Sequence, residues 1–111
     1  MKQNKKYPAS VPYRDFLLRE LKDPRACFGY LNAVLEEGDE DAFLIALHDV
    51  ADAQGGISRL ATMCKIHRVT LHRILSKHGN PKLDNLNAIL YALGLKLGIQ
   101  SLKPRRLHRA A

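Results

Sequence analysis

Residues 57–74, ISRLATMCKIHRVTLHRI, decide the fold of this chain because their apolar positions fit two short helices joined by a turn. Leu60 and Ala61 fall on the first helix, expected over 57–64, and Leu71 falls on the second, expected over 68–76. A small residue such as Ala61 lets two helices cross closely. The spacing therefore predicts a helix-turn-helix over 57–76.

The outward face of the second helix is polar and basic. It carries side chains that can meet base edges and phosphates in a DNA groove: His67, Arg68, Val69, Thr70, His72 and Arg73. Because arginine can donate two hydrogen bonds to guanine, Arg68 and Arg73 are the expected base readers, and Val69 can contact a thymine methyl group. Ser58 and Thr70 suit phosphate oxygens, and Lys77 completes the predicted DNA-binding set. Each residue taken alone also fits a solvated position on a surface helix.

Charge is unevenly distributed along the 111 residues, whose 18 Lys or Arg and 11 Asp or Glu give a net charge of +7. Residues 1–25 carry +4, residues 26–58 carry −7 with no Lys or Arg, and residues 59–111 carry +10. The last block contains the predicted helix-turn-helix, and a positive surface is what phosphate binding needs. The acidic block is either a solvated helix start or a surface for a basic protein partner.

Helical patterns flank the motif and predict a single helical domain over 13–102. Further helices are expected over 13–21, 24–37, 40–54 and 83–93. Asp23-Pro24 and Asp39 are start signals, while Gly38 and Gly94 are stop signals. The residues expected to face inward follow helical spacing: Phe16, Leu17, Leu21, Tyr30, Leu31, Val34, Leu35, Phe43, Ala46, Leu47, Val50, Leu86, Ile89, Leu90 and Leu93.

Residues 95–102 change to an alternating pattern, which predicts a short strand. Because a lone strand leaves its backbone unpaired, the expected mate is the same strand of another copy across a two-fold axis. The alternative is an extended tail packed on the helices. The expected fold is therefore all-α, a repressor-like bundle of five or six helices with a short C-terminal β-strand. Residues 1–12 and 103–111 are expected to be a flexible basic arm and tail.

Other functional classes gain little support from the sequence. Cys27 and Cys64 form no CxxC pair and are expected to be small buried or half-buried residues. His67 and His72 are five residues apart, which does not place two ligands on one helix face, so no metal site is expected. His48 is expected at the surface. No phosphate loop or activated nucleophile is evident, so neither an enzyme nor a cofactor is predicted.

No apolar run is long enough for a signal peptide or a membrane span. The sequence therefore predicts a cytoplasmic protein without a membrane partner.

Two further segments carry a family resemblance: LKDPRACFGYLNAVLEEGDEDAFLIALHDVADAQGGISRLA at 21–61 and GNPKLDNLNAILYALGLKL at 79–97. Through them, residues 13–102 resemble the bacterial probable addiction module antidote proteins, HigA-like antitoxins partnered with RelE/HigB-type toxins. Residues 57–94 are similar to the helix-turn-helix domain of Cro and lambdoid phage repressors. The resemblance implies a homodimer that binds double-stranded operator DNA, represses its own operon and neutralises a toxin that cleaves mRNA.

In the repressor frame, the resemblance places base-reading positions at His67, Arg68, Val69 and Arg73, with Thr70 toward the backbone. Two positions depart from the pattern. Lys65 stands in the turn where glycine is common, and a left-handed backbone there costs another residue about 1 kcal/mol. His67 replaces the usual serine at the start of the second helix.

Two alternative functions remain open. One is a stand-alone phage-type transcriptional regulator without a toxin partner. The other is a protein-interaction module whose acidic helices hold a basic partner and whose helix-turn-helix is vestigial.

Overall fold

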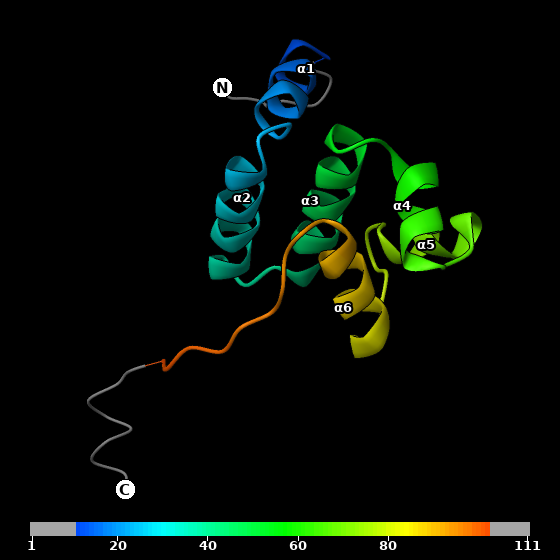
Figure 1. The fold of residues 1–111 in the computed structure, drawn as a ribbon. Coiled ribbons are helices and arrows are strands. Elements are labelled where there is room, and N and C mark those ends of the chain that lie inside the picture. Colours follow the sequence, from blue (N-terminus) through cyan, green and yellow to red (C-terminus); the bar gives the residue numbers. More distant parts are fainter. Residues whose placement is uncertain (1–10, 103–111) are drawn as a thin grey trace, which may run out of the picture.

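The computed structural model describes residues 11–102, and this part of the chain forms six helices and no strand. The helices are α1 (Val11–Glu20), α2 (Pro24–Glu36), α3 (Glu40–Ala53), α4 (Ile57–Cys64), α5 (Arg68–Ile74) and α6 (Leu83–Ala92). Figure 1 shows α3 in the middle, with α2 on one side of it and α4 and α5 on the other. The predicted all-helical bundle and its helix-turn-helix segments are thus present.

Local capping sets several of the helix boundaries. Asp23 begins α2 and Asp39 begins α3, as predicted, because each carboxylate accepts a backbone N–H of its helix, at 2.9 and 3.1 Å. Gly38 ends α2 with a φ of +80°, a conformation that glycine adopts without strain. The first helix begins at Val11, two residues earlier than expected, and α5 ends at Ile74, two residues earlier than expected.

The core is centred on α3. Its predicted inward residues Phe43, Ala46, Leu47 and Val50 are all buried. Buried side chains from the other helices complete the core: Cys27, Leu31, Leu60, Ala61, Leu71, Ile74, Ile89 and Leu90.

Two predicted core residues are in fact exposed. Phe16 of α1 is 53% exposed and Leu35 of α2 is 48% exposed. On α2 the buried positions are Cys27 and Leu31, with Val34 partly buried against the core, so Leu35 falls at the edge of the face that meets α3. A helix that packs against one neighbour buries one stripe only, and its other apolar residues stay outside.

The predicted C-terminal strand does not form in the described chain. Leu95 packs against the core and its N–H donates to the carbonyl of Leu90 at 2.8 Å. From there the chain continues as an extended segment (Figure 1), and Leu97 and Gly98 line a cavity together with Phe28 and Leu35 of α2. The prediction was wrong for this single chain because a strand requires a paired neighbour, and no other described segment is paired with this one.

The predicted flexible arm and tail lie largely outside the described residues. Only residues 11 and 12 of the arm are described, and they begin α1.

Candidate nucleic-acid interface

A tight turn joins α4 to α5. Lys65 takes the left-handed conformation there, with φ of 61° and ψ of 38°, at the position where glycine was the family expectation. The N–H of Ile66 donates to the carbonyl of Ala61 at 3.2 Å, which closes the turn. The turn therefore closes with lysine in place of glycine, at some cost in backbone strain.

His67 begins α5, as its place in the sequence predicted. Its Nδ1 accepts the backbone N–H of Val69 at 3.2 Å, so the imidazole does the capping that serine or threonine does in many helices. The cap fixes the ring of His67 at the exposed N-terminal end of α5.

The two sides of α5 differ sharply. Leu71 and Ile74 are 0% and 8% exposed and hold the helix against the core. The remaining predicted positions lie on the other side: Arg68, Val69, His72 and Arg73 are exposed, and Thr70 is half-buried. Val69, the apolar member of this set, is 60% exposed.

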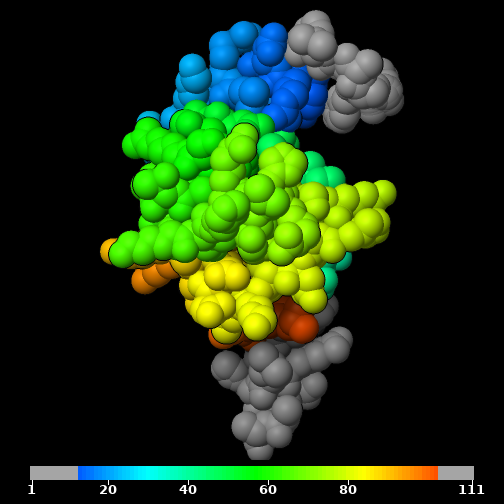
Figure 2. All heavy atoms as spheres, turned by 90° about the vertical axis from the view of Figure 1, so that its right-hand side faces the viewer, coloured from blue at the N-terminus to red at the C-terminus, as the bar shows by residue number. Residues whose placement is uncertain are grey.

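Ser58 and Lys77, the other two predicted contacts, are exposed on α4 and just beyond α5. Figure 2 faces this side of the molecule and shows α4 and α5 at the surface, between α1 and α6. No Asp or Glu stands between Asp52 and Asp84 in the sequence. The stretch of chain that forms α4, α5 and the turn after α5 is therefore basic or neutral throughout.

The turn after α5 is fastened to the start of α3. The backbone N–H of His78 donates to Asp41 at 3.1 Å, and the Nδ1 of its ring lies 3.1 Å from the same carboxylate. His78 itself has a φ of 69°. Gly79 follows with its Cα close against the last turn of α5, so that an added Cβ would overlap the carbonyl oxygen of Ile74.

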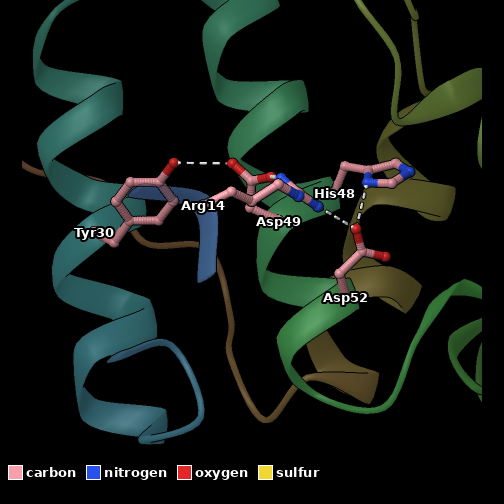
Figure 3. Close-up of polar contacts among 5 residues, drawn as sticks. All are labelled: Arg14, Tyr30, His48, Asp49 and Asp52. Atoms are coloured by element: carbon pink, nitrogen blue, oxygen red, sulfur yellow. Dashed lines mark hydrogen bonds and ion pairs between the residues drawn. The ribbon is translucent and has the colours of Figure 1, made fainter. Parts of the chain in front are cut away.

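A polar cluster joins α3 to α1 and α2. Asp49, only 7% exposed, accepts hydrogen bonds from Arg14 at 2.5 Å and from the hydroxyl of Tyr30 at 3.1 Å (Figure 3). The bond to Asp49 raises the pKa of Arg14, while burial and then the charge of Asp49 raise the pKa of Tyr30. The buried carboxylate thus has two donors, one from α1 and one from α2.

The cluster continues toward α5. Asp52 accepts a second hydrogen bond from Arg14 at 2.6 Å and lies 3.3 Å from Nδ1 of His48. His48 is half-buried, so its predicted surface position was wrong. Its ring meets that of His72 edge to face, with centroids 5.3 Å apart and planes at 87°.

Sequence reasoning missed this cluster. The four-residue spacing of His48 and Asp52 could have predicted the contact within that pair. The place of Asp49 between the inward-facing Leu47 and Val50 could have predicted that Asp49 is buried. No local signal points to Arg14, because its partners lie 35 and 38 residues away.

The cysteines are packed as the sequence predicted. Cys27 is buried and Cys64 is half-buried, and burial raises the pKa of both thiols. Each Sγ–H donates to a backbone carbonyl, of Leu21 at 3.0 Å and of Leu60 at 2.9 Å. Thiols held in this way are poor nucleophiles and serve as packing residues.

Residues 11–102 contain no group of three or more His, Cys, Asp or Glu side chains placed to hold a metal ion. Within the same range, no helix is long and apolar enough to cross a membrane.

The fold and this surface define a class, that of small all-helical proteins with a helix-turn-helix segment. Comparison with known proteins is more specific. The chain belongs to the family of probable addiction module antidote proteins, whose model matches residues 15–101. An addiction module antidote is an antitoxin, which implies a toxin as its partner.

One similar protein is an uncharacterized protein of Haemophilus influenzae, 35% identical over 71 residues that make up 64% of this chain and 72% of that protein. No solved structure shows a significant match.

Proposed function

We propose that this protein is an antitoxin that binds operator DNA, represses its own operon and neutralises a RelE/HigB-type toxin in the cytoplasm. The observation that carries the proposal is the orientation of α5. Its aliphatic side is buried, and its arginines and Val69 face outward from a part of the chain without acidic residues. Membership of the antidote family supports the toxin partner.

DNA binding follows from the side chains on this surface. With α5 in the major groove, Arg68 and Arg73 donate to guanine edges and Val69 contacts a thymine methyl group. The remaining members of the surface serve bases at the helix start or phosphates: His67, Thr70, His72, Ser58 and Lys77. Much of the affinity then comes from phosphate neutralisation and falls steeply with salt.

A homodimer through residues 95–102 accounts for the alternating pattern, which finds no mate among the described residues. Leu97 is 41% exposed and Ile99 is 100% exposed. Antiparallel pairing centred on Gly98 places each Leu97 beside the second copy's Ile99 on the same face, whereas a shift by one residue pairs apolar with polar side chains.

Pairing centred on Gly98 predicts a disulfide-linked dimer for Gly98→Cys under mild oxidation, because the two copies of residue 98 then face each other. An added Cβ at Gly98 has no neighbour within 4 Å, so the substitution fits. The control is Gly29→Cys on α2, an exposed position with equally open surroundings. Non-reducing electrophoresis and light scattering give the result. A monomer in solution contradicts the homodimer, and a dimer that does not cross-link places the interface elsewhere.

The toxin is proposed to bind α1 and α2, which lie outside the helix-turn-helix. These helices expose large apolar side chains, Phe16, Phe28 and Leu35, each about half exposed. Phe28 and Leu35 line one cavity on α2, and a contiguous exposed apolar surface is typical of protein-binding sites.

The function as a whole is tested by co-expressing the chain with the product of the adjacent gene, purifying the pair and footprinting the upstream DNA. We expect a stable complex and protection of two half-sites about one helical turn apart. Protection without a bound partner favours the stand-alone regulator. A bound partner without DNA binding at low salt favours the protein-interaction module.

A further inference from the structure

The proposed DNA-reading helix has an aromatic contact with α3. His72 stands on the exposed side of α5, three and four residues after Val69 and Arg68, so the three side chains are neighbours on the helix. Its ring meets the ring of His48 edge to face at 5.3 Å. The contact therefore reaches α5 in the middle of the side chains that are proposed to read bases.

His48 is itself held in place by a chain of polar contacts. Its Nδ1 lies 3.3 Å from Asp52, and Asp52 accepts a hydrogen bond from Arg14 of α1 at 2.6 Å (Figure 3). Arg14 cannot move independently, because its other nitrogen bonds Asp49, which is buried. The guanidinium thus bridges two carboxylates on the same face of α3, and the second carboxylate holds His48.

These contacts matter for α5 because the helix is short. The helix has seven residues, about two turns, and few positions with which to fix its own orientation. Leu71 and Ile74 anchor its buried side. The ring pair adds a contact with α3 at an exposed residue of α5, where it opposes rotation of the helix, and a base-reading helix tolerates little displacement.

We propose that His48 is a positioning residue for α5. Asp52 and Arg14 hold the ring of His48 in place, so the packing of α1 on α3 determines the orientation in which α5 meets DNA. The inference deepens the proposed DNA binding and rests on it. It also gives a route from α1 to the DNA surface: a partner that displaces Arg14 removes the support of His48.

A double-mutant cycle on the operator dissociation constant tests the coupling. Asp52→Ala leaves the Arg14–Asp49 bond in place, and Asp52 is not itself in contact with DNA in the proposed pose. We expect Asp52→Ala and His72→Ala each to weaken operator binding by about three- to tenfold. The double variant should be no weaker than His72→Ala alone, because both changes remove the same support. Multiplicative losses, or no loss with Asp52→Ala, overturn the proposal.

Two controls separate positioning from charge and from folding. Asp15→Ala on α1 makes the same change of net charge at an exposed site and should leave the dissociation constant unchanged. His48→Phe keeps a ring beside His72 and should retain most of the affinity that His48→Ala loses. Equal losses for His48→Phe and His48→Ala contradict a role for the ring pair.

A measurement without DNA keeps this inference distinct from the proposed function. The ring protons of His72 sense the neighbouring ring of His48, so their NMR shifts should move in Asp52→Ala and stay in place in Asp15→Ala. Unmoved shifts overturn the coupling even if DNA binding is confirmed. Moved shifts in a protein that binds no operator establish the coupling and refute the proposed function.

Discussion

Replacing both Arg68 and Arg73 with alanine is expected to remove the preference for operator over random DNA. A bidentate arginine–guanine pair contributes about 1–3 kcal/mol of discrimination, so losing two of them reduces the specificity ratio on the order of a thousandfold. Binding to random DNA should persist in weakened form, because Ser58, Thr70 and Lys77 remain for phosphate contacts. The fold should be unaffected, since both arginines are exposed.

The specificity ratio is measured by shift assays on operator and random duplexes at several salt concentrations. The control combines Arg19→Ala with Arg25→Ala, which removes the same charge from α1 and α2. It should weaken binding to operator and to random DNA equally, by no more than the loss of two positive charges explains. An equal loss on both duplexes for the Arg68 and Arg73 variant would show that these side chains contact phosphates only. The proposed reading of bases by α5 would then be wrong.

Gly79→Ala is expected to destabilise the protein by about 3 kcal/mol or more, at or beyond the top of the usual range of about 1–3 kcal/mol for an overpacked core, because the clash is with backbone. The new methyl group would overlap the carbonyl oxygen of Ile74 and come within 2.8 Å of its carbon. Neither atom can turn aside as a side chain does. The end of α5 or the turn held by Asp41 must move instead.

Urea unfolding followed by circular dichroism measures this loss. Gly29→Ala is the matched control, because an added Cβ there meets nothing within 4 Å and α2 gains about 0.5–1 kcal/mol from a better helix former. The two substitutions should therefore change the free energy of unfolding in opposite directions. A Gly79→Ala variant as stable as the parent would mean that the turn after α5 adapts without cost.

The sequence predicted the helices well where the determinants are local. Asp23, Asp39 and Gly38 act on the residues next to them, so their effects are visible in a short stretch of sequence. The exposure of Leu35 was not visible in this way, because the face that α2 buries depends on where α3 lies. The prediction of a strand over 95–102 was wrong for a related reason, since strand pairing needs a neighbouring strand that residues 11–102 do not supply.

The candidate interface divides in the same way. The outward side of α5 follows from helical spacing around Leu71, and the structure places the predicted side chains there. Their contacts with DNA remain a prediction. The bond from Arg14 to Asp49 joins residues 35 positions apart, and the contact of His48 with His72 joins two helices. Such contacts depend on the three-dimensional arrangement, which periodicity does not encode.

The acidic turn between α2 and α3 and the basic surface of α4 and α5 lie on different sides of the molecule (Figure 1). Within residues 11–102, the part of the chain that the structure describes, this separation contributes an electric dipole. In the field of a polyanion, such a dipole turns the molecule before any contact is made, so that approach begins with α5 forward and the acidic side trailing. Encounters should then be productive more often than random tumbling allows, and this advantage should disappear when added ions shorten the range of the field.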